Sequence, residues 1–262
     1  RLIFNYWYHH YQIIANDLNL RMDKDFLSSV CLSQNLSDNR QDFKYFDKIN
    51  QSKVIIVGAG PSIEDKQIQD YILNTYQKLR SNNMNKSKKP KLVLMVADGA
   101  SELILDLQIV PDFVVTDLDG PFESLLKAGE KGSVMVVHAH GDNIEKISSS
   151  SVSNFRKIVG TTQSFPITNI FNFGGFTDGD RCVFLADHFL AKEIVLVGMD
   201  FDSRIGYFSK REVMNYEFKR RKLFFAKSLI EMLSKRTNSE IVQISSSNYT
   251  SPIYGVNKNI IL

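Results

Sequence analysis

The chain has 262 residues, of which 43% are hydrophobic and 23% charged, and its formal net charge is +3 at pH 7. This composition excludes a largely disordered chain, and so weak a positive charge gives no support for nucleic-acid binding. Two widely spaced cysteines exclude a disulfide framework, and no apolar run approaches the roughly 20 residues of a membrane helix, so we expect a cytoplasmic protein without a membrane partner.

The N-terminal region, residues 1–50, is polar and aromatic and shows no strand alternation. We predict an N-terminal helical extension of two helices, with Asp23 or Asp25 as the N-cap of the second. Aromatic side chains such as Trp7 and Tyr11 are expected to pack on the main domain, the alternative being a contact between subunits. We expect a monomer or a small homo-oligomer.

Residues 51–262 show short apolar runs that alternate with longer amphipathic stretches. This pattern is typical of a mostly parallel sheet with helices on both faces, so we predict a three-layer, Rossmann-like α/β domain. The clearest helix is predicted at 211–235, and residues 82–91 are predicted to form a polar, basic loop. The predicted strands are 54–57, 92–96, 113–115, 134–137, 167–173, 194–197 and 241–244.

Acidic residues follow the predicted strands at the points where each strand ends. They are Asp98, Asp117, Asp119, Asp142, Asp178, Asp180 and Asp200. In an open parallel sheet the carboxyl ends of the strands share one edge, and ligands bind in the crevice outside it. Carboxylates crowded at that edge would repel one another unless a cation neutralised them, and Mg²⁺ takes oxygen ligands. The sequence therefore predicts a divalent-metal site at this edge.

Asp117 and Asp119 are the best predicted ligands of that cation. Side chains two residues apart on an extended segment point to the same side, and Gly120 then turns the chain away. Asp98 is expected near the metal or the nucleotide, although the pair Asp98–Gly99 is also a common turn. The sequence does not determine whether one or two metal ions bind at these aspartates.

A glycine-rich turn, GAGPS, follows the first predicted strand at residues 58–62. Its backbone N–H groups are expected to approach phosphates at a helix N-terminus. The turn lacks the third glycine of a dinucleotide fingerprint, and no Walker lysine follows it. The alternative is a tight strand-to-helix turn in which Ser62 caps the helix.

Two histidines, His138 and His140, follow the fourth predicted strand at alternate positions and would lie on one face. With Asp142 they would form a softer metal site. The interpretation that we prefer is a hydrogen-bonding or substrate-contacting role for one histidine and burial for the other.

Arg181 and the basic run at 219–222 each have two interpretations. Arg181 either pairs with the neighbouring carboxylates or contacts a phosphate. The run 219–222, KRRK, either binds a polyphosphate tail or forms a solvated helix face, which is the commoner role of a charge run.

The succession GAGPS, ADGA, PDFVVTDLDG, HAHGDN, FGGFTDGDR and GMDF resembles the archaeal 6-hydroxymethyl-7,8-dihydropterin pyrophosphokinase family. That family shares a domain type with flagellin-modifying, glycosyltransferase-like proteins. The resemblance runs from residue 53 to residue 201, and more loosely through the helix predicted at 211–235. The second and third motifs also resemble thiamin pyrophosphokinase, but Gly120 stands where a serine would end the motif, and no β-rich second domain follows.

The resemblance implies Mg²⁺-dependent transfer of diphosphate from ATP to the hydroxymethyl group of the pterin, with release of AMP, in pterin-cofactor biosynthesis. By motif, Asp117 and Asp119 would hold magnesium, with Asp98 beside it as a third catalytic residue. The implied ATP-binding residues are Gly58, Gly60, Ser62, Asp98 and Gly99. By position, the candidates for holding the pterin are His140, Asp142, Asn143, Asp178, Asp180 and Arg181.

Four other functions remain open at this point. A thiamin pyrophosphokinase-like enzyme would use thiamin as the acceptor. A nucleotide-sugar glycosyltransferase would consume a sugar nucleotide without forming AMP from ATP. A non-catalytic module would bind ATP without turnover, and an oxidoreductase would carry a coloured flavin or depend on nicotinamide.

Overall fold

A nine-stranded parallel sheet, in the order β6-β5-β4-β3-β2-β1-β7-β8-β9, forms the centre of the computed structural model. The model describes residues 2–36, 42–83, 91–149, 151–202, 204–209, 215–249 and 251–262. The strands are β1 (Lys53–Val57), β2 (Leu92–Ala97), β3 (Phe113–Thr116), β4 (Val134–Ala139), β5 (Ile158–Thr162), β6 (Ile170–Phe171), β7 (Glu193–Val197), β8 (Glu240–Ser245) and β9 (Lys258–Ile261).

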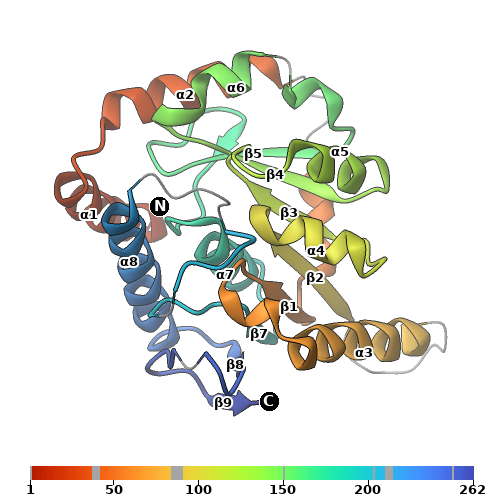
Figure 1. Ribbon diagram of the computed structural model, residues 1–262. Helices are drawn as coiled ribbons and strands as arrows, with labels where there is room; N and C mark the ends of the chain where they lie inside the picture. Colours follow the sequence, from red (N-terminus) through yellow and green to blue (C-terminus); the bar gives the residue numbers. More distant parts are fainter. Residues whose placement is uncertain are drawn as a thin grey trace.

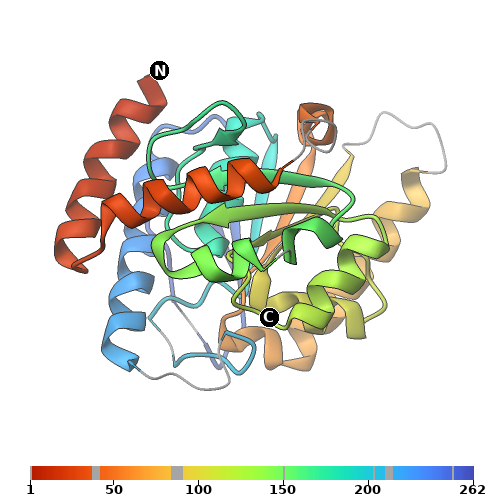
Figure 2. The ribbon, with the colours of Figure 1, turned by 90° about the horizontal axis from the view of Figure 1, so that it is seen from above.

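Helices cover both faces of this sheet (Figures 1 and 2). They are α1 (Leu2–Asp17), α2 (Met22–Asn35), α3 (Lys66–Asn83), α4 (Ser101–Asp106), α5 (Phe122–Glu130), α6 (Ile144–Ser148), α7 (Asp178–His188) and α8 (Tyr216–Ser234). Because side chains alternate along a strand, Val54 and Ile56 pack with α1, α7 and α8, whereas Ile55 and Val57 pack with α3 and α4. The predicted three-layer α/β architecture is confirmed.

The strand predictions differ from the structure at three places. Only Ile170–Phe171 of the predicted strand 167–173 pairs in the sheet, because residues 172–177 form the loop that leads into α7. The strand β5 was missed, since Gly160 interrupts its apolar run. A Cβ there would lie 2.5 Å from Ile170 Cδ1, so a larger residue would have to displace that side chain. The strand β9 was also missed, and all its residues are exposed.

The two predicted N-terminal helices are present as α1 and α2, but the predicted cap is wrong. Arg21 is the N-cap residue of α2, and Asp23 and Asp25 lie in its first turn. Trp7 and Tyr11 are buried in the core that also contains α7 and α8, so the packing within the chain is confirmed. Most of the predicted loop 82–91 and the start of the helix predicted at 211–235 lie outside the described residues.

The strand order places a topological switch point between β1 and β7. From β1 the chain builds the sheet in one direction through β6 and then returns to β7 on the other side. Ligand sites of open α/β sheets lie at the carboxyl ends of the strands at such a point. Within the described residues, no helix is long and apolar enough to cross a bilayer.

Candidate functional site

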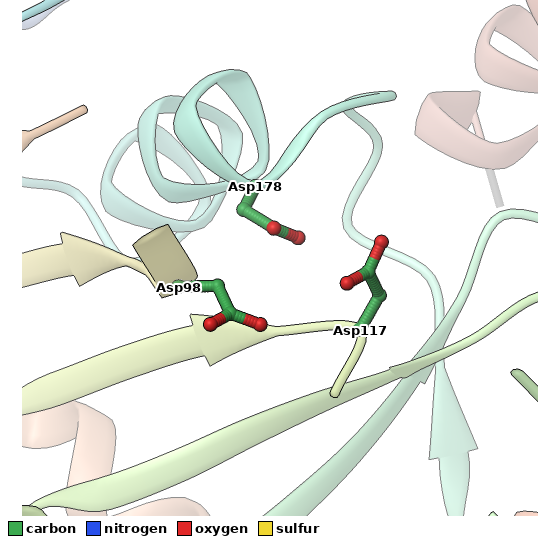
Figure 3. A group of neighbouring side chains, drawn as sticks. All are labelled: Asp98, Asp117 and Asp178. Carbon is green, nitrogen blue, oxygen red and sulfur yellow. The ribbon is translucent and has the colours of Figure 1, made fainter. Parts of the chain in front are cut away.

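Three carboxylates converge at the carboxyl edge of the sheet (Figure 3). Asp98 follows β2, Asp117 follows β3, and Asp178 is the first residue of α7. One oxygen of each side chain lies within 4.8 Å of the oxygens of the other two. Because the parallel strands β2 and β3 are neighbours, they end side by side, and α7 crosses them with its N-terminus above both.

Asp98 is the most enclosed of the three, with 3% of its surface exposed. Its Oδ2 accepts hydrogen bonds from the Thr116 hydroxyl at 2.5 Å and from the Gly120 N–H at 3.1 Å. Its Oδ1 is buried and has no hydrogen-bond partner among the described residues. Burial, together with the charge of Asp117, raises the pKa of Asp98 to about 7. An unpartnered buried carboxylate oxygen is costly unless something binds it.

Asp117 is held in its charged form by its neighbours. His140 Nε2 lies 3.3 Å from Asp117 Oδ2, and His140 Nδ1 accepts the Asp142 N–H at 3.4 Å. Burial opposes ionisation of Asp117, but His140, Lys222 and Arg181 outweigh it and lower the pKa of the carboxyl group.

Asp178 is paired on one side with Arg181, whose guanidinium lies 3.1 Å from Asp178 Oδ1. Burial and the charge of Asp117 nevertheless raise the pKa of Asp178 well above its ordinary value. The donor set of the cluster is therefore three carboxylates, one of them with an unpartnered oxygen. All-oxygen donors and a shortage of positive charge fit a hard divalent cation such as Mg²⁺.

Asp119 does not belong to this cluster, contrary to the geometric argument that paired it with Asp117. The segment after β3 is not extended, because Leu118 has a φ of 66°. The chain turns, so the Asp119 N–H donates to Asp117 Oδ1 at 3.1 Å while its carboxylate pairs with Lys146 at the rim. The third carboxylate of the cluster is instead Asp178, which lies 61 positions after Asp117 in the chain, and sequence spacing gave no reason to choose it.

A cleft of about 470 Å³ opens over the cluster at the β1–β7 switch point. Gly58, Gly60 and Gly99, which were predicted to bind ATP, line this cleft together with Asp200. The N–H groups of Gly58 and Gly60 do not face a ligand, however. They donate to the carbonyls of Val197 and Gly198, both at 2.8 Å. The glycines allow the ends of β1 and β7 to touch, since a Cβ on Gly60 would lie 2.6 Å from the Gly198 oxygen.

Ser62 lies behind the wall of the cleft and does not line it. Its side chain is fully buried, and its N–H donates to Asp200 Oδ2 at 2.8 Å. It lies within a 3-10 helix, η3 (Pro61–Glu64), whose N-cap is Gly60, so the alternative role as an N-cap is also wrong. Sequence reasoning noticed Asp200 but gave it no role. Its Oδ1 is buried and unpartnered within the described residues, and burial raises its pKa.

A second hollow, of about 280 Å³, adjoins the cleft. The corner between α1 and α2 forms one wall, from Leu18 to Asp25, and the turn at His140 forms another. Four residues line both hollows, namely Asp117, Arg181, Phe218 and Lys222. The two hollows therefore meet beside the carboxylate cluster.

Three of the predicted pterin contacts, His140, Asp142 and Arg181, line the second hollow, and Asp178 lines the cleft. Asn143 and Asp180 line neither. The Asn143 amide accepts from the His140 N–H and the Ser28 hydroxyl and donates to the carbonyls of Asp117 and His138. It fixes the two loops but has no capacity left for a ligand.

Asp180 is a structural residue of α7. Its two oxygens accept the N–H groups of Phe176 and Thr177, both at 2.6 Å, and the Thr177 hydroxyl at 2.5 Å. This is a capping box with Thr177 as the N-cap residue. The carboxylate of Asp180 thus accepts three hydrogen bonds from the loop before α7 and lines neither hollow. The predicted substrate contact at Asp180 is therefore wrong.

A residue that sequence reasoning missed is Asp25, at the second hollow. Its Oδ1 accepts the Gly141 N–H at 2.6 Å, and its Oδ2 accepts Gln163 Nε2 at 2.7 Å and the Tyr11 hydroxyl. These bonds connect α2 to the turn after β4. Nothing in the sequence indicated this role, because an acidic residue in the first turn of a helix is explained by the helix dipole.

His138 is buried, and its Nδ1 lies 3.1 Å from the Thr161 hydroxyl. His140 instead contacts Asp117, so the preferred interpretation of the two histidines is confirmed. Among the described residues, the cluster with metal-ligand spacing is Asp98, Asp117 and Asp178, and neither histidine belongs to it. The softer histidine site is therefore not formed.

Comparisons with known proteins agree on one family. Residues 31–206 match the model described as 6-hydroxymethylpterin diphosphokinase MptE-like. A protein of Methanocaldococcus jannaschii is 40% identical over 250 residues, which is 90% of this chain and 98% of the relative. One of Pyrococcus furiosus is 37% identical over 245 residues, covering 91% and 97%. One of Methanothermobacter thermautotrophicus is 38% identical over 199 residues, covering 74% and 78%. Each relative is named 6-hydroxymethyl-7,8-dihydropterin pyrophosphokinase.

Among solved structures, the MAf glycosyltransferase of Magnetospirillum magneticum AMB-1 is similar, with a TM-score of 0.50 and 14% identity. The likeness covers 84% of this chain but only 37% of the glycosyltransferase. At this identity it shows a shared fold and carries no information about the reaction.

Proposed function

The chain belongs to the MptE-like family of 6-hydroxymethylpterin diphosphokinases, and we propose that it transfers the diphosphate group of ATP to 6-hydroxymethyl-7,8-dihydropterin. The hydroxymethyl oxygen attacks the β-phosphorus and forms a new P–O bond. The bond between that phosphorus and the oxygen bridging to the α-phosphate breaks, and the bridging oxygen leaves with the electron pair as part of AMP. The hydroxyl proton passes to water.

The observation that carries this proposal is the pair of hollows that meet beside the carboxylate cluster. A transfer between two bound molecules needs both reacting groups held in line. The cleft at the β1–β7 switch point has the larger volume and lies where open sheets bind nucleotides, so we assign ATP to it. The smaller hollow then takes the bicyclic pterin, and Asp117 stands between the two.

Asp98, Asp117 and Asp178 would hold a divalent cation at this meeting point. When bound, such a cation neutralises charge on phosphate oxygens. The protein's own part is to keep the three carboxylates close. The Thr116 hydroxyl and the Gly120 N–H orient Asp98, while His140 and Arg181 hold the other two.

Polar groups that would bind the two substrates line both hollows. Asp200 lines the nucleotide cleft with a buried, unpartnered oxygen that would accept a ribose or adenine donor. Around the smaller hollow, Asp25, Gln163 and Asp142 offer acceptors to the N–H groups of a pterin edge. Phe176 also lines this hollow and would offer an aromatic face to the pterin ring.

The test is to incubate the protein with ATP, Mg²⁺ and 6-hydroxymethyl-7,8-dihydropterin and to follow AMP and pterin diphosphate by chromatography. Asp178→Asn and Asp119→Asn form a matched pair, because each removes one carboxylate charge, inside and outside the cluster. We expect the first to reduce turnover about 100-fold or more and the second much less, since single preorganised charges contribute on this scale. Thiamin replaces the pterin in a parallel reaction.

Different results would lead to different conclusions. AMP formed with thiamin but not with the pterin would move the assignment to a thiamin pyrophosphokinase-like enzyme. Consumption of a sugar nucleotide without AMP would favour glycosyl transfer. Tight ATP binding without any product would indicate a binding module. Equal loss in both aspartate variants would contradict the cluster as the metal site.

A further inference from the structure

The basic run on α8 is divided between two environments. Lys219 and Lys222, three residues apart and thus on one helix face, line the nucleotide cleft. Arg220 is exposed, and Arg221 forms an ion pair with Asp17 of α1. Both ribbon views show α8 beside α1 (Figures 1 and 2). Half of the run is therefore a solvated face, and the other half faces the site.

Lys222 lies at the meeting point of the two hollows, whereas Lys219 lines only the cleft. The Lys222 ammonium is 5.6 Å from the centre of the Phe176 ring, and its side chain is half-buried. Within the described part of the chain, Lys222 forms no ion pair. It shares the walls of both hollows with Asp117, so its side chain lies beside the carboxylate cluster.

The other cation at this point is already engaged. Arg181 is buried and donates hydrogen bonds to Asp178 Oδ1 and Gln163 Oε1, both at 3.1 Å. Its positive charge is therefore paired with the Asp178 carboxylate. Three carboxylates and the phosphates of ATP give a large excess of negative charge, which one divalent ion does not neutralise. Phosphoryl-type transfer requires positive charge at the group that moves.

We propose that the Lys222 ammonium contacts the diphosphate group as it passes from the nucleotide cleft to the acceptor hollow, while Lys219 contacts phosphate only on the nucleotide side. This inference rests on the proposed function. It assigns to α8 a part of the site that the matched family region, residues 31–206, does not include. The bonds made and broken are those of the diphosphate transfer, and Lys222 takes up no proton.

The experiment compares Lys222→Ala, Lys222→Arg, Lys219→Ala and the control Arg220→Ala, which removes a charge of the same helix outside the cleft. Steady-state rates of AMP formation give kcat and KM, and calorimetry gives Mg²⁺–ATP binding without acceptor. For Lys222→Ala we expect kcat to fall 100- to 1,000-fold, the scale for one preorganised charge, with ATP binding weakened less than tenfold. The kcat of Lys222→Arg should be at least tenfold higher than that of Lys222→Ala.

Lys219→Ala should mainly raise KM for ATP, and Arg220→Ala should stay within twofold of the unmodified protein. A kcat of Lys222→Ala within threefold of the unmodified protein would overturn the inference. So would Lys222→Arg being as slow as Lys222→Ala with an equally lowered Tm, which would indicate packing against Phe176 alone. If the unmodified protein forms no AMP, the proposed function fails, and this inference fails with it.

Discussion

At the scale of single residues, the carboxylate cluster is a local conflict within the fold. Like charges and burial both penalise the ionised forms, which is why the pKa values of Asp98 and Asp178 are raised while neighbouring cations lower that of Asp117. A site that destabilises its own empty state binds a cation more strongly, because binding relieves the repulsion.

The first prediction concerns pH. Because the pKa of Asp98 is about 7 in the folded protein and roughly 3.9 in an unfolded chain, the cation-free protein loses stability as pH rises from about 4 to about 7. Below about pH 7 protons compete with the cation. We therefore expect Mg²⁺ to raise Tm more at pH 8 than at pH 5.5, measured by thermal unfolding. An equal increase at both values would show that these carboxyl groups do not bind it.

The second prediction concerns Gly120, whose N–H donates to Asp98. A Cβ at this position would lie 1.6 Å from Asp98 Oδ1, so Gly120→Ala must displace that carboxylate. We expect affinity for Mn²⁺, followed by electron paramagnetic resonance, to fall about 10- to 100-fold, as for other losses of ligand orientation. Gly129→Ala adds the same methyl group within α5 and should leave Mn²⁺ binding unchanged. Unaltered affinity in Gly120→Ala would exclude Asp98 as a ligand.

At the scale of elements, α7 both supports and forms the site. Its N-terminus is fixed by the Thr177–Asp180 capping box, and its first residue is the third member of the cluster. Its apolar side packs against β1, β2 and β3, and its outer side contacts α8. The position of Asp178 therefore depends on the Thr177–Asp180 capping box, which is not itself part of the carboxylate cluster.

The third prediction tests that cap. Asp180→Ala leaves three donors of the loop before α7 without their acceptor, so we expect the free energy of unfolding in urea to fall by roughly 2 kcal/mol. The exposed Asp70→Ala on α3 serves as the control and should change it by less than about 0.5 kcal/mol. A loss of activity without a loss of stability would instead return Asp180 to the substrate site.

At the scale of the whole molecule, the N-terminal helices are not an independent appendage. Trp7, Tyr11 and Ile14 of α1 belong to the same core as α7, α8 and one face of the sheet. The Trp7 indole N–H donates to the Gln163 carbonyl at 2.8 Å, beyond β5. The α1–α2 corner also completes the smaller hollow.

The fourth prediction follows from this shared core. We expect calorimetry to show one cooperative unfolding transition, since α1 has no separate core in which to remain folded. Residues 1–50 were predicted as an extension of the main domain, and a separate low-temperature transition of these helices would favour that division. Saturating Mg²⁺ and a non-hydrolysable ATP analogue should shift the whole transition, by about 2.7 kcal/mol at 100 times the dissociation constant.

The sequence by itself determined the class of fold and the edge of the sheet that carries the chemistry. Apolar runs of strand length, separated by amphipathic stretches, specify a parallel sheet, and a parallel sheet gathers its carboxyl ends on one side. The aspartates that follow those runs, Asp98 and Asp117 among them, were therefore predicted to be neighbours from local pattern alone. The motifs also indicated the family, because their order along the chain needs no structure.

Only the tertiary structure decided which side chains meet. The left-handed conformation at Leu118 turned Asp119 to the rim, and the crossing of α7 over the strand ends brought Asp178 to the cluster in its place. The hollow beside the α1–α2 corner and the orientation of Lys222 likewise depend on helix packing between distant segments. Such contacts join residues far apart in the chain, and neither periodicity nor spacing encodes them.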